Sequence, residues 1–151
     1  MNQRYETLDT NNKIIRNLWN ISHTMRNISE GKGSQKRILI LLKDNDHITQ
    51  RELTQLLGIQ PGSASEVISK LEAAGLLIRT PSQTDRRTTE LSLTGAGYAA
   101  AAEAAAMREK RHEKMFACLS DSEKERLLVL LEKLNNSWEE QYGKPDRENR
   151  K

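Results

Sequence analysis

Glycine and proline, the residues that most often interrupt helices and strands, are unevenly distributed along this chain of 151 residues. Five of the eight glycines and two of the three prolines fall between positions 58 and 97. The sequence on either side of this segment contains few residues that would stop a helix. The distribution therefore predicts a centre of short elements and tight turns, with a long helical arm before it and another after it.

The sequence before the centre carries one apolar stripe at the spacing of an amphipathic helix. The stripe consists of Ile14, Leu18, Ile21, Met25 and Ile28. Successive members are four or three residues apart, with polar residues between them, so all five fall on one face of a helix. Gly31 and Gly33 are expected to end this helix.

The sequence after the centre carries a second stripe with similar spacing. This stripe consists of Leu127, Leu130, Leu131, Leu134 and Trp138. Ser120 and Glu123 have the spacing of a capping box, which predicts that the helix begins there. The alanine-rich stretch 99–106, with Thr94 as a candidate N-cap before it, predicts another long helix that connects the centre to this one. Positions 143–151 are expected to be disordered.

The two stripes have two interpretations on spacing alone. They could pack against each other within one chain, or against a second copy in a dimer. Apolar residues make up 36% of the chain, so its own core is modest, and a stripe could find its partner on another chain. Both interpretations stay open at this point.

The centre begins with the pattern of short helices joined by a tight turn. Positions 34–43 indicate a buried helix, with a strand as the alternative. Thr49 and Glu52 form a second capping-box pattern, and Gly58 suits the end of a short helix. Pro61 suits the first position of the next helix, and Gly75 suits its end. Such a pair is typical of a helix-turn-helix, whose second helix can enter the major groove of DNA.

The second of these two helices has a polar face opposite its apolar one. The outward positions are Gly62, Ser65, Glu66, Ser69 and Lys70. Small and hydroxylated side chains there suit close approach and hydrogen bonds to phosphates or base edges. The alternative is an ordinary solvent-exposed helix face.

A β-hairpin is predicted directly after this helix. Positions 76–80 and 88–93 have strand patterns, and the loop 81–87 between them contains Asp85, Arg86 and Arg87. A hairpin in this place is a wing, and an arginine at its tip can enter a narrow minor groove. Asp85 is expected to orient one of the arginines through a salt bridge. The alternative is a solvated turn.

Four parts of the sequence, taken together, resemble the MarR (multiple antibiotic resistance regulator) family of bacterial transcription regulators. They are the segments 48–59 and 60–77, the triplet 85–87 and the run LTGAG at 93–97. The resemblance covers nearly the whole chain apart from its two tails. It implies a mainly α fold with a small β-hairpin wing (α+β), built as a winged helix-turn-helix plus a helical dimerisation region. It also implies a homodimer that binds short pseudo-palindromic operators in double-stranded DNA, usually as a repressor relieved by a small molecule or an oxidant.

The resemblance divides the chain into functional segments. These are an N-terminal dimerisation helix (1–33), a winged helix-turn-helix lobe (34–94), a long connecting helix with a C-terminal dimerisation helix (95–142) and a tail (143–151). The dimerisation residues implied are Ile14, Leu18, Ile21, Leu127, Leu131, Leu134 and Trp138.

The resemblance, together with the basic residues that converge on the helix-turn-helix and wing, gives a set of predicted DNA-binding residues. They are Arg51, Ser63, Ser65, Glu66, Ser69, Lys70, Arg79, Asp85, Arg86 and Arg87. Arg87 matches the arginine that enters the minor groove, Asp85 its orienting partner, and Arg86 a phosphate contact. Gly62 and Glu66 depart from the family's usual residues. Glu66 could accept a hydrogen bond from cytosine N4, weaken non-specific attraction, or pair with Lys70 one turn later, and we favour the pair.

No pattern in the sequence supports catalysis, a cofactor or a metal site. His23, His47 and His112 are isolated, and no glycine-rich phosphate loop or nucleophile motif is found. Cys118 lies among apolar neighbours, which favours a buried structural thiol over an oxidant sensor. A single cysteine, the lack of a signal sequence and the lack of an apolar run near about 18 residues predict a cytoplasmic protein without a membrane partner.

The sequence is compatible with two functions. The leading hypothesis is a homodimeric, sequence-specific DNA-binding transcriptional regulator, which acts as a repressor released by a small-molecule effector. The alternative is a winged-helix protein-interaction module with weak or no specific DNA binding. A net charge of only +3 and the carboxylate of Glu66 keep this alternative open. The arginines and the lysine that converge on the helix-turn-helix and wing argue against it.

Overall fold

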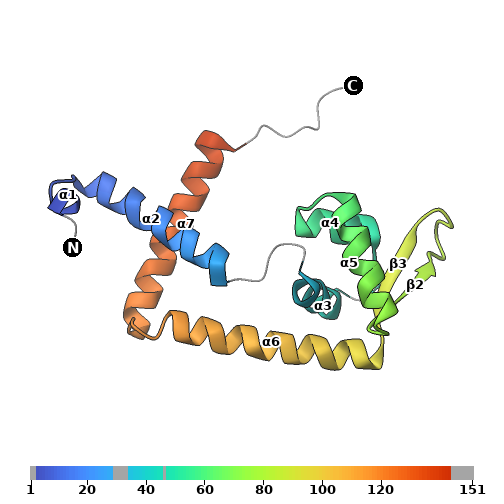
Figure 1. Ribbon diagram of the computed structural model, residues 1–151. Coiled ribbons are helices and arrows are strands. Elements are labelled where there is room, and N and C mark those ends of the chain that lie inside the picture. The colour runs from blue at the N-terminus through green and yellow to red at the C-terminus, as the bar shows by residue number, and fades with distance from the viewer. Residues whose placement is uncertain (1–2, 29–33, 46, 144–151) are drawn as a thin grey trace, which may run out of the picture. The chain divides into compact units, whose positions relative to one another are not determined.

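The computed structural model describes residues 3–28, 34–45 and 47–143, and the chain forms two compact units, Met1–Ala106 and Met107–Lys151 (Figure 1). In chain order the elements are α1 (Gln3–Glu6), α2 (Thr10–Ile28), α3 (Gln35–Asp44), β1 (Ile48–Thr49), α4 (Gln50–Leu57), α5 (Pro61–Ala73), β2 (Leu77–Pro81), β3 (Thr89–Leu93), α6 (Gly95–Met115) and α7 (Asp121–Tyr142). The predicted mainly α fold with a small β wing is confirmed. None of the helices in the described ranges is long and apolar enough to cross a membrane.

The helix predicted from the N-terminal stripe is α2. A short helix, α1, precedes it and was not predicted. None of the side chains of α2, which lies wholly within the described range 3–28, is buried in the single chain. Ile21 is 56% exposed and Trp19 66% exposed. The predicted end of this helix at Gly31 and Gly33 lies outside the described residues.

The segment predicted as either a buried helix or a strand is the helix α3. Ser34 caps it, because the Ser34 hydroxyl accepts a hydrogen bond from the Arg37 backbone N–H at 3.2 Å. The inner face of α3 places Ile38, Leu39 and Leu42 in the core of the first unit. The cap therefore decides between the two predicted alternatives, since it satisfies a backbone donor that only a helix start leaves free.

A three-stranded antiparallel sheet with the order β1-β3-β2 lies beside these helices. The predicted hairpin is confirmed as β2 and β3, with Leu77 opposite Leu93 and Pro81 opposite Thr89. The third strand, β1, was not predicted: Ile48 and Thr49 pair with β3 directly before α4 begins. A two-residue strand is too short to show a period in the sequence, and only its pairing with β3 identifies it.

The hydrophobic core of the first unit joins α3, α4, α5, the sheet and the start of α6. Its fully buried large side chains are Ile38, Leu42, Leu53, Leu57, Ile68, Leu71, Leu77 and Leu91. Each helix contributes one face, and the opposite faces of α4 and α5 are left at the surface. This arrangement fixes which side chains of α5 are available to a ligand.

Thr94 joins three segments at the point where α6 begins. Its hydroxyl accepts a hydrogen bond from the Gly97 N–H at 3.0 Å and donates one to the Gly75 carbonyl at 2.6 Å. The Thr94 N–H donates to the Leu76 carbonyl at 3.1 Å. Gly97 is buried, and a Cβ atom at this position would lie 1.8 Å from the Leu76 carbonyl oxygen. The predicted N-cap is confirmed, and it also ties α6 to the segment between α5 and β2.

The second unit consists of the end of α6, a turn and α7. The predicted start of α7 is confirmed: the Ser120 hydroxyl accepts from the Glu123 N–H, and the Glu123 carboxylate accepts from the Ser120 N–H. The prediction that Cys118 is buried is wrong in the single chain, where its side chain is exposed. Cys118 lies in the turn after α6 rather than on a packed helix face. Most of the tail predicted to be disordered, 144–151, lies outside the described residues.

Candidate nucleic-acid interface

The helices α4 and α5 form a helix-turn-helix whose two ends are fixed by local chemistry (Figure 1). At the start of α4, the Thr49 hydroxyl accepts from the Glu52 N–H at 3.1 Å, and the Glu52 carboxylate accepts from the Thr49 N–H at 2.8 Å. The bonds from Thr49 lower the pKa of Glu52 below its ordinary value. Gly58 ends α4 in the left-handed region, at φ +62°, and Pro61 begins α5.

The predicted polar face of α5 is confirmed as a surface. Ala64, Ile68 and Leu71 are buried on the inner side of α5. The predicted DNA-binding residues on the other side are exposed at Ser63, Glu66, Ser69 and Lys70 and half-buried at Ser65. Arg51, in the first turn of α4, is also exposed. The sequence therefore located the outward face of the second helix correctly.

Glu66 and Lys70 form the intrahelical pair that the spacing favoured. Lys70 Nζ donates to Glu66 Oε1 at 2.8 Å. This hydrogen bond, together with the positive charge of Lys70, lowers the pKa of Glu66. Both side chains are exposed, so the pair adds little to stability, and it neutralises the one basic side chain on this face of α5.

Arg79 is held by α5 rather than projecting into solvent. Its Nη2 atom donates to the Ser69 hydroxyl at 2.7 Å, and its Nε atom lies 3.6 Å from Glu72 Oε2. Its side chain is 28% exposed. Arg79 comes from β2, so these contacts connect the first strand of the wing to the second half of α5. Sequence reasoning predicted that Arg79 faces DNA and did not predict this contact.

The loop of the wing is shaped by backbone hydrogen bonds around Asp85. The Asp85 carboxylate accepts from the Arg87 N–H at 2.9 Å, and the Asp85 carbonyl accepts from the Thr88 N–H at 3.0 Å. The expected salt bridge is not found, because within the described residues Asp85 pairs with neither arginine. Asp85 therefore orients Arg87 through the main chain, as an aspartate does in an Asx turn.

The side chains of Arg86 and Arg87 are exposed at this loop. Throughout the described ranges, neither guanidinium makes an ion pair or hydrogen bond within the chain. Ser82, at the other end of the loop, is buried, and its N–H donates to the Thr88 carbonyl at 2.9 Å. Nothing in the sequence singled out Ser82, because its role depends on the closure of the hairpin.

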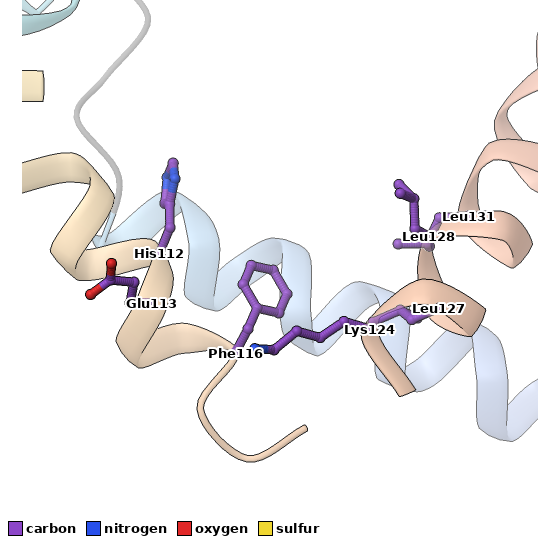
Figure 2. A pocket seen from close by; sticks show the side chains of 7 residues that line it. All are labelled: His112, Glu113, Phe116, Lys124, Leu127, Leu128 and Leu131. Atoms are coloured by element: carbon purple, nitrogen blue, oxygen red, sulfur yellow. The ribbon is translucent and has the colours of Figure 1, made fainter. Parts of the chain in front are cut away.

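The residues predicted to dimerise lie on helices that expose apolar side chains. None of the side chains of α7, which is described over its whole length, is buried in the single chain. A pocket of about 360 Å³ lies within the second unit between the end of α6 and the start of α7. Figure 2 shows Phe116, from the turn directly after α6, on one side of it and Leu128 and Leu131, from α7, on another. Two predicted dimerisation residues, Leu127 and Leu131, thus line an apolar hollow at the surface.

Comparison with known proteins adds to this geometry. The profile of the MarR family matches residues 32–88. A Thauera aromatica protein, whose name assigns it to transcriptional regulation of the hcr operon, is 34% identical over 99 residues, which are 64% of this chain and 58% of that protein. The match thus spans less than two thirds of that relative's length.

Two solved structures are similar over most of the chain. A MarR protein from Peptoclostridium difficile is 24% identical with a TM-score of 0.68, over 89% of this chain and 92% of that one. The transcriptional repressor CouR, solved bound to a 23-mer DNA duplex, is 30% identical with a TM-score of 0.59, over 75% of this chain and 80% of that one. The first similarity establishes the fold, and the second extends the likeness to a protein solved on DNA.

Proposed function

The chain belongs to the MarR family of DNA-binding winged helix-turn-helix transcriptional regulators, which are not enzymes, and from this premise we propose that it acts as a homodimeric repressor of a pseudo-palindromic operator. The 1–33 and 95–142 segments would hold the two copies together, and 34–94 would contact DNA. The observation that carries the proposal is the wing loop, where Arg86 and Arg87 are exposed beside an outward polar face of α5.

The two surfaces suit different parts of a DNA duplex. The N-terminal half of α5 exposes Gly62 and Ser63, small residues that allow a close approach to base edges in the major groove. Arg87 at the wing suits the minor groove, whose negative potential is strongest where the groove is narrow. Arg86 suits a phosphate. CouR, which was solved on a 23-mer duplex, supports this use of the same fold.

The homodimer is supported by apolar side chains that a single chain leaves exposed. Those of α2 and α7 include Ile14, Ile21, Trp19, Leu128, Leu131 and Trp138. Exposed apolar surface on this scale marks an interaction site in a soluble protein. A second copy would cover these helices and place two α5 helices about 34 Å apart, one turn of B-DNA, which is the spacing that a palindromic operator requires.

Selection from a pool of random DNA duplexes tests the proposal. We expect the purified protein to enrich a pseudo-palindrome and to bind it with an affinity that falls steeply with salt, since each phosphate contact releases counterions. A winged-helix protein-interaction module would enrich no sequence. Absence of binding to every duplex at low salt would contradict the proposed function and favour that alternative.

Release by a small-molecule effector, in the cytoplasm where operators lie, is the finer part of this proposal. Its support is the similarity to the family. Thermodynamic linkage provides a test of release by an effector. A compound that lowers the affinity for the operator must bind the free protein more tightly than the DNA-bound protein, by the same factor.

A further inference from the structure

We propose that Arg79 is a positioning residue, which fixes the Ser69 hydroxyl as a hydrogen-bond donor to a DNA phosphate instead of contacting DNA itself. This inference rests on the proposed DNA-binding function. It assigns to Arg79 a role different from the direct contact that the sequence predicted.

The geometry places Arg79 between the wing and α5. Its Nη2–H donates to Ser69 Oγ at 2.7 Å, and its Nε faces the Glu72 carboxylate at 3.6 Å. The guanidinium thus directs two edges of its fork at two residues of one helix, a geometry that a lysine ammonium cannot reproduce. Within the described residues the Arg79 Nε atom is buried and makes no hydrogen bond, so its contact with Glu72 is an ion pair, and Ser69 receives the one hydrogen bond from the fork to α5.

The hydrogen bond from Arg79 determines whether the Ser69 hydroxyl acts as a donor or as an acceptor toward DNA. A guanidinium has donors and no acceptor, so Ser69 Oγ must accept from Arg79, and its own hydrogen is left for another acceptor. In a helix a serine often donates to the carbonyl four residues earlier, here that of Ser65. In the described part of the chain Ser69 makes no such bond, and its side chain is exposed.

The position of Ser69 along α5 indicates that its hydroxyl donates to a DNA phosphate and not to a base edge. Ser69 lies in the second half of α5, whereas the N-terminal residues of a recognition helix reach the base edges. Serine hydroxyls commonly contact phosphate oxygens, which accept and do not donate. Because Ser69 Oγ accepts from Arg79, its own hydrogen is free to be donated to a phosphate before DNA arrives.

Because Glu72 lies beside Arg79, we expect Arg79 to add little to the electrostatic attraction between the protein and DNA. The Glu72 carboxylate lies at ion-pair distance from Arg79, and the pair is close to neutral when seen from the DNA. A neutral hydroxyl contact releases no counterion, whereas a direct arginine–phosphate contact lowers the salt slope of binding by about 0.9 when it is lost. The two roles for Arg79 therefore differ in a measurable quantity.

The experiment measures the affinity for the selected operator across a salt series for R79M, R79K, S69A and the double variant R79M/S69A. R86A, which removes the same charge from a proposed phosphate contact, is the matched control. We expect R79M and S69A each to weaken binding by about fivefold to tenfold, the effect of one hydrogen bond, with an unchanged salt slope. We expect the double variant to lose no more than either single variant, and R79K to behave as R79M.

Two outcomes would overturn the inference while leaving the proposed function intact. One is a salt slope that falls in R79M as it does in R86A, with R79K close to the wild type. The other is an S69A protein that binds as well as the wild type. If R79M does not fold, S69A and R79K still decide the matter, because Ser69 is exposed and R79K keeps the charge. A wild-type protein that binds no duplex would overturn the proposed function, and the inference with it.

Discussion

Arg87 receives its position from the main chain of the wing, through its N–H bond to the Asp85 carboxylate, and its side chain is exposed. Replacing it with alanine should therefore leave the fold intact. We expect R87A to weaken operator binding by at least about tenfold, the usual cost of losing a specific arginine contact, with no change in the thermal unfolding temperature. Fluorescence anisotropy with the selected duplex measures the affinity, and circular dichroism the unfolding.

Q83A is the control for this prediction, since Gln83 is exposed in the same loop and uncharged. It should bind as the wild type does. An R87A protein that unfolds at a clearly lower temperature would show that Arg87 supports the wing and would contradict its assignment to DNA.

Glu66 places a negative charge on the face of α5 that is proposed to meet DNA, and it occupies Lys70 in an ion pair. We expect E66Q to bind random-sequence DNA more tightly than the wild type, because a like charge facing the phosphates is removed and Lys70 is freed. Competition assays with a scrambled duplex measure this. Loss of operator preference at unchanged affinity for random DNA would instead indicate that Glu66 reads a cytosine.

At the scale of helices and strands, the start of α6 lies against the segment that precedes β2, where Gly97 passes the Leu76 carbonyl. Since an added Cβ would lie 1.8 Å from that oxygen, the backbone of one element must move. We expect G97A to lower the free energy of unfolding by about 1–3 kcal/mol or more. Urea denaturation measures the difference.

Gly95, in the same first turn of α6, has no heavy atom within 4 Å of its would-be Cβ. G95A is therefore the matched control and should be neutral or slightly stabilising, because alanine is the better helix former. Equal destabilisation in both variants would show that the turn requires glycine for its backbone and not for its space.

The capping box of α4 should make stability depend on pH. The pKa of Glu52 is lowered in the folded chain, so its contribution is present above the ordinary glutamate pKa, about 4.3, and is lost as the pH falls through the folded value. Glutamine can fill the same capping position without titrating. We expect the difference in unfolding free energy between the wild type and E52Q to be constant near neutral pH and to shrink below about pH 4.3. A difference that does not change with pH would contradict this.

The elements differed in how much their own sequence revealed. The stripes of α2 and α7, the caps at Ser34, Thr49 and Ser120, and the β2–β3 hairpin follow from local patterns, and all could be predicted. β1 could not, because two residues become a strand only by pairing with β3. Ser82 and the contact of Arg79 with Ser69 were also missed, because both depend on segments that meet only after folding.

For the whole molecule, the proposed dimer can be tested at one side chain. Ile21 on α2 is 56% exposed in the single chain, and Leu56 on α4 is 53% exposed but lies outside the proposed dimerisation segments. We expect the wild type to sediment as a dimer and I21D to shift towards monomer, because a carboxylate would be buried at the interface. L56D makes a similar change at similar exposure and should remain dimeric. A wild-type monomer at micromolar concentration would contradict the proposal.

The Thr94 hydroxyl connects two segments of the chain directly at the point where α6 begins. Its oxygen caps the start of α6 and donates to the Gly75 carbonyl in the turn after α5, while Gly97, in the first turn of α6, lies against the Leu76 carbonyl just before β2. A displacement of the first turn of α6 would therefore have to break these hydrogen bonds or carry the segment between α5 and β2 with it.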